Sequence, residues 1–114
     1  MPHPALAYKV LTSEQMAAFA RDGVFAGAPV DVADGFIHLS TAEQLTATVD
    51  KHFAGQEGLW VLEVDLAALG AVVKWEPSRG GALFPHAYAM LPLGAVVARG
   101  LLERDGEGAV RLPG

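Results

Sequence analysis

The order of apolar and polar residues predicts a strand and then a short helix at the start of the chain. Residues 5–11, ALAYKVL, are mostly apolar, which is typical of a buried strand with Tyr8 and Val10 on one face. Thr12 and Gln15 follow at the spacing of a capping box. Apolar residues then recur at helical spacing until Gly23, so a helix is expected to end there.

A second strand and helix are predicted farther along. Residues 24–35, VFAGAPVDVADG, are rich in Gly, Pro and Asp, which favours a long loop with at most a brief strand at its start. The segment FIHL at 36–39 is expected to be a short strand. Ser40 and Glu43 then have capping-box spacing, with Ser40 as N-cap, and the apolar period predicts a helix over 42–52.

The remaining pattern is dominated by strands. Pro85 cannot donate a backbone hydrogen bond, so FPHAYA is expected to be a loop that enters a brief strand. The expected segments are strands LWVLEVDL (59–66) and AVVKWEP (71–77), a flexible loop at 78–82, and a closing hairpin over 95–113 with its tip at 105–108. Two helices near the N-terminus followed by strands lack the alternation of a doubly wound sheet. The sequence therefore predicts an α+β fold with largely antiparallel pairing.

Composition limits the classes of protein to consider. The 114 residues suit a single domain over 1–114, and 52% hydrophobic residues supply a core. A net charge of −5 without a cluster of basic residues argues against binding to duplex nucleic acid or to an acidic membrane. The chain has no cysteine and no signal-peptide pattern at its start, which predicts a cytoplasmic protein. The high hydrophobic content also allows an apolar patch that a homodimer would cover.

His38 interrupts an apolar segment and is the first candidate functional residue. In an extended chain His38 and Ser40 point to one face, while Ile37 and Leu39 point to the other and serve the core. The alternative is a half-buried histidine that is hydrogen-bonded to backbone. Ser40 has a plain role as helix N-cap, and a cap beside a histidine also suits an anion.

A second group of candidates lies in WEPSRGGALFPHAY, residues 75–88. An arginine there can contact phosphate or carboxylate through two hydrogen bonds, and an aromatic ring can stack on a base. The alternative is an ordinary loop with a surface pair of Glu76 and Arg79. His38 and His86 each lie beside a Gly- and Pro-rich loop, which favours one shared cleft. The candidates in this segment are Trp75, Glu76, Ser78, Arg79, His86 and Tyr88.

Several other kinds of site are excluded or disfavoured. The four histidines have neither HExxH nor H-x-H spacing, so no metal site is predicted. The sequence lacks the GxSxG elbow of hydrolases and the phosphate loop GxxxxGK[ST]. It also lacks GxGxxG within a βαβ unit, which excludes a Rossmann site.

Three segments together resemble a known bacterial family. They are YKVL (8–11), DGFIHLSTAEQ (34–44) and WEPSRGGALFPHAY (75–88), and their order and spacing resemble those of domain of unknown function 952 over about Tyr8 to Val97. That family is grouped with ADP-ribosyltransferase-like folds. The resemblance implies a split, mostly antiparallel β core with two short helices near the N-terminus and a cleft for NAD or a related nucleotide. GFIHLS is also similar to the V-H-L-S segment of RNA 2′-phosphotransferases in the same group.

The resemblance also implies roles for residues. His38 would hold a ribose or phosphate, with Ser40 or Thr41 beside it. The catalytic glutamate of protein ADP-ribosyltransferases has only loose candidates here, namely Glu63, Glu76 and Glu103.

The predicted function is therefore binding of NAD or a nucleotide, with transfer or hydrolysis of an ADP-ribosyl or phosphate group and NAD as a candidate substrate. His86 would exchange a proton with the substrate, because a histidine titrates near neutral pH. Arg79 would stabilise negative charge, and Trp75 or Tyr88 would stack on a ring. The alternatives are a non-catalytic module that binds a small anion or metabolite, or a protein-interaction domain.

Overall fold

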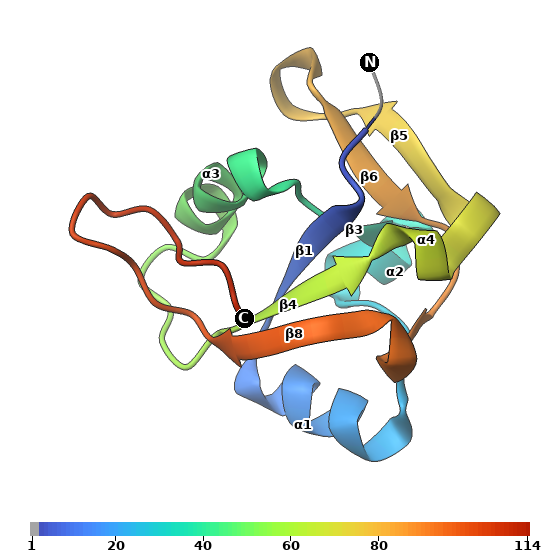
Figure 1. Cartoon of the computed structure of the whole chain (residues 1–114), viewed down its shortest axis with the longest axis horizontal. Helices are drawn as coiled ribbons and strands as arrows, with labels where there is room; N and C mark the ends of the chain where they lie inside the picture. Colours follow the sequence, from blue (N-terminus) through green and yellow to red (C-terminus); the bar gives the residue numbers. More distant parts are fainter. Residues whose placement is uncertain (1–2) are drawn as a thin grey trace.

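The computed structural model describes residues 3–114, without the side chain of Arg79 (Figure 1). The strands are β1 (Leu6–Leu11), β2 (Val24–Phe25), β3 (Ile37–His38), β4 (Trp60–Asp65), β5 (Val73–Pro77), β6 (Leu83–Ala87), β7 (Leu91–Pro92) and β8 (Val96–Leu101). The helices are α1 (Ser13–Asp22), α2 (Pro29–Asp34), α3 (Ala42–His52) and α4 (Leu66–Leu69), with 3-10 turns η1 (Gly70–Val72), η2 (Arg79–Gly81) and η3 (Leu93–Ala95).

The strands form three small sheets, in the orders β1-β4-β8, β3-β6-β5 and β2-β7. Every strand pairing within the described part of the chain is antiparallel, which confirms the predicted α+β class with mostly antiparallel pairing. Tyr8 and Ser40 exchange two backbone hydrogen bonds of 2.7 and 2.9 Å. Because Tyr8 lies in β1 and Ser40 follows β3, this bridge joins the two three-stranded sheets.

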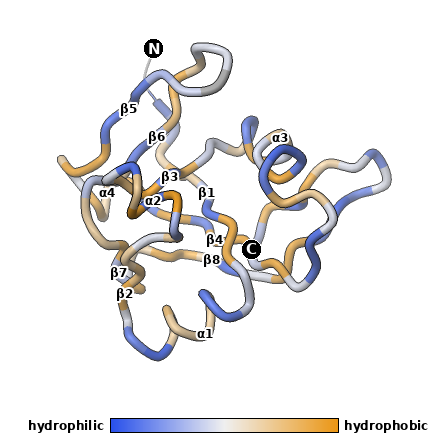
Figure 2. The backbone as a smooth tube through the Cα atoms, turned by 180° about the vertical axis from the view of Figure 1, so that it is seen from behind, coloured by the Kyte–Doolittle hydropathy of each residue, from blue (hydrophilic) through white to orange (hydrophobic). Residues whose placement is uncertain are grey.

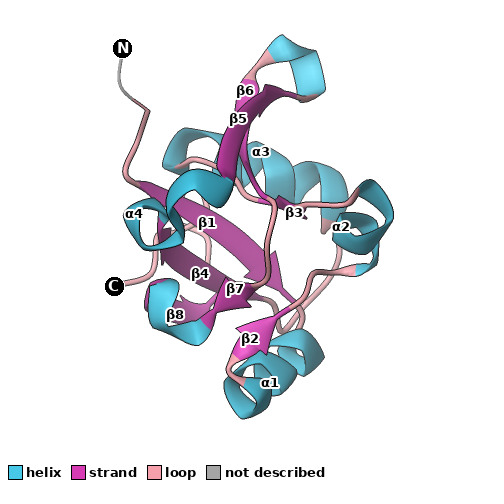
Figure 3. Ribbon diagram, turned by 90° about the vertical axis from the view of Figure 1, so that its right-hand side faces the viewer, coloured by secondary structure: helices cyan, strands magenta, loops and turns pink. Residues whose placement is uncertain are grey.

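Alternation along β1 divides the core into two apolar clusters. Ala7 and Leu11 point toward the cluster that contains Phe19 of α1, whereas Tyr8 and Val10 point toward the cluster that contains residues of α3. The predicted common face of Tyr8 and Val10 is therefore confirmed. Figure 3 shows α1 and α3 beside the sheet of β1, β4 and β8. Apolar burial on both faces of this sheet is the main stabilising contribution.

The predicted helices over 12–22 and 42–52 are present, and the capping box of Thr12 and Gln15 is confirmed. The second capping box was placed one residue too early. Thr41, not Ser40, is the N-cap of α3, and its hydroxyl accepts a 3.2 Å hydrogen bond from the backbone N–H of Gln44. Gln44 Oε1 in turn accepts from the Thr41 N–H at 3.0 Å. The side chain of Ser40 is therefore available for another contact.

The expectation of only two short helices was wrong, because α2 and α4 are also present. The segment 29–34 was expected to be loop, yet it forms α2 with Pro29 in its first turn and Gly35 as its left-handed C-cap at φ 86°. Its burial is inverted relative to an ordinary amphipathic helix. Val30 and Val32 are 58% and 66% exposed, whereas Asp31 is 1% exposed. The hydrophobic period on which helix prediction depends is therefore missing.

The expectation for FPHAYA was also wrong, because β6 is the central strand of its sheet. Pro85 is tolerated there for a geometric reason. The carbonyl of Pro85 accepts a 3.0 Å hydrogen bond from the N–H of Leu39, which lies just past the end of β3. In an antiparallel strand the N–H and C=O of one residue point to the same side. The missing N–H of Pro85 thus faces the β3 side and removes no bond from the ladder with β5.

The C-terminal segment forms a hairpin whose tip lies where it was predicted. The N–H of Asp105 donates to the carbonyl of Ala109 at 2.8 Å, and Arg104 and Val110 form an isolated bridge. Strand β8 itself pairs with β4 rather than with the returning chain. Figure 2 shows that the tip of this hairpin is hydrophilic. Among residues 3–114, no helix has both the length and the apolar character needed to span a bilayer.

The shifted capping box gives a direct test of the start of α3. Thr41→Ala should lower the free energy of unfolding by about 1 kcal/mol, because the backbone N–H of Gln44 loses its capping acceptor. Glu43→Ala is the matched control, since Glu43 is exposed in the first turn and should cost less than about 0.5 kcal/mol. Urea unfolding of both variants measures the difference. Equal losses would contradict the assignment of Thr41 as the N-cap.

Candidate functional site

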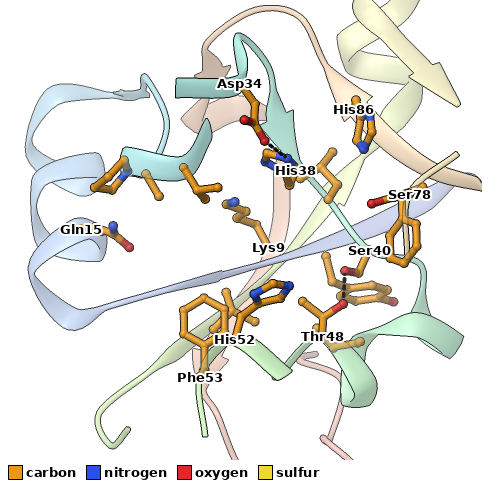
Figure 4. A pocket seen from close by; sticks show the side chains of 18 of the residues that line it. Lys9, Gln15, Asp34, His38, Ser40, Thr48, His52, Phe53, Ser78 and His86 are labelled. Carbon is orange, nitrogen blue, oxygen red and sulfur yellow. Dashed lines mark hydrogen bonds and ion pairs between the residues drawn. The ribbon is translucent and has the colours of Figure 1, made fainter. Parts of the chain in front are cut away.

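A cavity of about 540 Å³ lies where β1, α2, β3, α3 and β6 meet. Lys9, His38 and His86 border it together with residues of α3 (Figure 4). The view shows His38 and His86 at one end of the cavity, with His52 and Phe53 at the other. Strand β3 and its continuation to Ser40 thus connect the part of the cavity near β6 to the part near β1 and α3.

The structure brings the two predicted histidines together. His38 and His86 are directly opposite each other in the antiparallel pairing of β3 with β6. Their ring centroids are 5.4 Å apart, and Phe36 stacks on His86 with a centroid separation of 4.1 Å. Ile37 is buried in the core, as the alternation predicted. Cross-strand neighbours on one face are held at short distance by the backbone ladder, so both rings reach one cavity.

A buried carboxylate connects Lys9 to His38. Asp31 lies 3.0 Å from the Lys9 Nζ atom and 2.7 Å from the His38 Nδ1 atom. Its oxygens also accept hydrogen bonds from the backbone N–H groups of Ala28 at 2.7 Å and His38 at 3.0 Å. Such saturation is needed, because a buried charge without partners is strongly destabilising.

The local backbone explains how Asp31 reaches this position. Asp31 is at the third position of α2, where its side chain turns back to the N–H of the N-cap Ala28. Gly27 precedes with φ of 119°, and a Cβ atom at this position would lie 2.9 Å from the Cβ of Asp31. Glycine is therefore required both by the backbone angle and by the close approach of α2.

Charge on this network follows from the contacts. Burial raises the pKa of Asp31, but the Lys9 ammonium and the hydrogen bonds from His38 and Ala28 outweigh it and leave the pKa below its usual value. Burial lowers the pKa of Lys9, and Asp31 opposes that effect. The other ring nitrogen of His38, Nε2, is 3.0 Å from an oxygen of Asp34. Both ring nitrogens can donate to carboxylates only when the ring carries two protons, so this geometry suits an imidazolium.

His86 has a different environment. Its Nδ1 lies 2.8 Å from Glu76 Oε1, which also accepts a 2.7 Å hydrogen bond from the Tyr88 hydroxyl. The hydrogen bonds from His86 and Tyr88 lower the pKa of Glu76, so this side chain is an acceptor. The proton between the two groups is therefore assigned to Nδ1, which leaves Nε2 of a neutral ring as an acceptor. His86 is 3% exposed, and Nε2 has no hydrogen-bond partner among the described residues.

The other predicted site residues lie in different places. Ser40 borders the cavity, and its hydroxyl is 2.8 Å from that of Thr48. Thr41 and Trp75 line a separate hollow, where Trp75 stacks on His3 with ring centroids 4.1 Å apart. The side chain of Arg79 lies outside the described part of the structure.

Two more predicted contact residues, Glu76 and Tyr88, are not among those that line the cavity. Glu76 instead contacts the cavity residue His86, and Tyr88 contacts Glu76. A direct ligand contact by four of the predicted residues would therefore require a surface other than the cavity wall. These residues are Thr41, Trp75, Glu76 and Tyr88.

Sequence reasoning missed several residues of the site. Lys9 was not among the predicted site residues, although it lies within an apolar strand and shares the face of Ala7 and Leu11. A lysine on a core face is a signal that a buried acid lies nearby. Asp31 and Asp34 were hidden in the segment read as loop. The cavity also includes Thr48 and His52, which lie on the α3 face toward the cavity.

The described residues contain no cluster of three or more His, Asp or Glu side chains suited to holding a metal ion. The chemistry available at the cavity is that of hydrogen bonding and proton transfer. It combines a histidine fixed by two carboxylates, a histidine with one accepting nitrogen, and a pair of hydroxyl groups.

Comparison with known proteins agrees with this architecture. The crystal structure of protein CC0527 from Caulobacter crescentus is 45% identical in sequence, covers 94% of each chain and has a TM-score of 0.85. The solution NMR structure of CC0527 is 44% identical over 94% of this chain and 91% of that chain, with a TM-score of 0.79. No curated protein matches the chain.

The family comparison is equally direct. The model of the family described as "Protein of unknown function (DUF952)" matches residues 10–99, which is most of the chain and includes Asp31, His38 and His86. The expected resemblance over about Tyr8 to Val97 is thus confirmed as to family. The chain belongs to the DUF952 family.

Proposed function

We propose that the cavity binds a nucleotide-like metabolite of the NAD or ADP-ribose type and that His86 accepts a proton from a hydroxyl group there. The observation that carries this proposal is the buried Nε2 atom of His86, which has no partner among the described residues. A buried acceptor without a hydrogen bond costs about 1 to 3 kcal/mol. A ligand hydroxyl that donates to Nε2 would recover that free energy.

The size and lining of the cavity support a ligand of this class. A volume of about 540 Å³ lies within the usual range for small-molecule sites. Tyr8, Phe53 and Phe84 supply aromatic walls against which a base can lie. The hydroxyl groups of Ser40 and Thr48 supply donors and acceptors for a ribose.

The arrangement of His86 and Glu76 supports proton transfer. A general base oriented by a carboxylate is a recurrent catalytic device. In the proposed reaction Nε2 takes the proton of water or of an acceptor hydroxyl, and that oxygen bonds to the anomeric carbon of the ribose. The carbon–nitrogen bond then breaks, and nicotinamide leaves with the electron pair. For a phosphoryl substrate, the same proton transfer would activate the attacking oxygen, which bonds to phosphorus while the leaving oxygen departs with the electron pair of the broken P–O bond. Glu76 would stabilise the imidazolium that forms.

A non-catalytic binding module is the second candidate, and one observation favours it. None of the three glutamates considered for the transferase role lines the cavity. Glu63 accepts a 2.8 Å hydrogen bond from Tyr8, Glu76 contacts His86, and Glu103 is exposed. The cavity therefore has no glutamate for the transferase role, and fold kinship alone does not give activity.

Titration calorimetry followed by product analysis tests both candidates. We expect saturable binding of NAD or ADP-ribose to the wild-type protein, and release of nicotinamide from NAD over hours. AMP and adenosine are matched ligands that separate the contribution of phosphate from that of the nucleoside. Saturable heat without any product would identify a binding module. Absence of binding to every one of these ligands would contradict the proposed function.

A further inference from the structure

The side chain of Asp34 interacts with His38 at the edge of the cavity. Asp34 Oδ2 is 3.0 Å from His38 Nε2, and this carboxylate is 48% exposed. It contrasts with Asp31, which holds the other ring nitrogen and is 1% exposed. Of the two carboxylates that contact the His38 ring, Asp34 can therefore rotate into water more easily than Asp31.

Charge counting shows why this difference matters. Lys9 and an imidazolium at His38 bring two positive charges, and Asp31 and Asp34 bring two negative charges. Only Asp31 is fixed by burial and by backbone N–H groups. Rotation of Asp34 into water would leave one uncompensated positive charge and one N–H donor at the cavity wall.

The geometry points to an anion-binding position at His38 Nε2 that the Asp34 carboxylate itself occupies and that a phosphate or carboxylate group of a ligand takes over by displacing it. Anionic oxygens form short, strong hydrogen bonds with such a donor. The position lies near the His86 ring, because the two ring centroids are 5.4 Å apart. The matching ligand carries an anionic group next to a hydroxyl group, as a sugar phosphate or a 2-hydroxy acid does. This inference rests on the proposed function for the hydroxyl contact, but not for the anion.

The test measures binding of inorganic phosphate by NMR titration of wild type, Asp34→Asn and Asp22→Asn. Asp22 is the matched control, because its substitution changes the net charge equally while its side chain pairs with Arg21 on α1, away from the cavity. Asp34→Asn should bind phosphate about fivefold to tenfold more tightly than wild type, because the competing carboxylate is gone. Asp22→Asn should match wild type within about twofold.

Further ligands show which chemical groups the anion-binding position accepts. Acetate in place of phosphate shows whether a carboxylate suffices. Ribose 5-phosphate should bind more tightly than inorganic phosphate, and His86→Phe should remove that gain while leaving the phosphate contact. Asp34→Ser is a second variant in case the asparagine perturbs the end of α2.

Equal affinities of Asp34→Asn and Asp22→Asn for phosphate, or no measurable phosphate binding to Asp34→Asn, would overturn the inference. Tighter phosphate binding to Asp34→Asn would support it even if NAD and ADP-ribose fail to bind. Failure of the inference and failure of the proposed function therefore give different results.

Discussion

Replacing Asp31 by asparagine should lower the free energy of unfolding by about 3 to 5 kcal/mol. The substitution keeps the shape of the side chain but removes the charge between Lys9 Nζ and His38 Nδ1. Two cationic groups would then lie in a buried or half-buried site without their shared negative charge. Urea unfolding followed by circular dichroism measures the loss, which corresponds to a fall of many degrees in Tm for a domain of this size.

Two controls test whether the loss of stability comes from the buried charge pair. Asp22→Asn breaks a surface pair with Arg21 and should cost less than about 0.5 kcal/mol. The double variant Lys9→Met with Asp31→Leu removes both members of the buried pair and should recover part of the loss. A loss below about 1 kcal/mol for Asp31→Asn would show that the network is not a major source of stability.

The dependence of stability on pH should show whether Asp31 stabilises the fold through its charge or through its shape. The folded pKa of Asp31 lies below the ordinary value of 3.8. Its stabilising contribution is therefore fully present above that ordinary value and is lost as the pH falls through the lower folded pKa. Asparagine does not titrate, so the gap in stability between wild type and Asp31→Asn should narrow as the pH falls below the ordinary pKa of 3.8.

Replacing His86 by phenylalanine should weaken the binding of NAD or ADP-ribose about a hundredfold while leaving the fold intact. Phenylalanine keeps a ring against Phe36 and removes a buried nitrogen that has no partner among the described residues. It also removes the hydrogen bond to Glu76, whose side chain retains Tyr88 and contact with water. We expect the free energy of unfolding to change by less than about 1 kcal/mol.

The effect on binding should be much larger. A site built to accept a hydrogen bond loses about a hundredfold or more in affinity when the acceptor is removed. Calorimetry with whichever of NAD and ADP-ribose binds the wild type measures this loss. His3→Phe is the matched control, since His3 stacks on Trp75 in the separate hollow and should leave affinity within about twofold. Wild-type affinity in His86→Phe would refute the role of this histidine.

Much of the scaffold follows from the hydrophobic pattern. Strands β1 and β4 and helices α1 and α3 each present an ordinary apolar face to the core, so local periodicity is sufficient to predict them. His38 was found because it interrupts an apolar segment at a position where the alternation points away from the core, and His86 because it lies beside a Gly- and Pro-rich loop. Their pairing across β3 and β6 depends on register, which one sequence does not specify by itself.

The rest of the site was not predicted, because the burial pattern of α2 is the reverse of the usual one. Helix α2 exposes Val30 and Val32 and buries Asp31, which is the reverse of the rule used to find surface helices. Its start and end did carry signals, since Pro29 and Gly35 are typical of a first turn and a C-cap. The buried partner of Asp31, Lys9, lies twenty-two positions earlier in another element. Such a long-range pairing of charges has no local pattern.

Because His38 pairs directly with His86, ligand binding depends on the register of β3 and β6. Side chains along a strand alternate between faces, so a slip of β3 by one position against β6 would turn His38 away from His86 and bring Ile37 onto the cavity face. A slip by one position would thus keep one ring at the cavity and lose the other, so only the native register pairs the two imidazoles. A chain with the native pairing of β3 and β6 has therefore also formed the cavity that both rings border. A chain with a shifted register would lose hydrophobic burial and would be less stable.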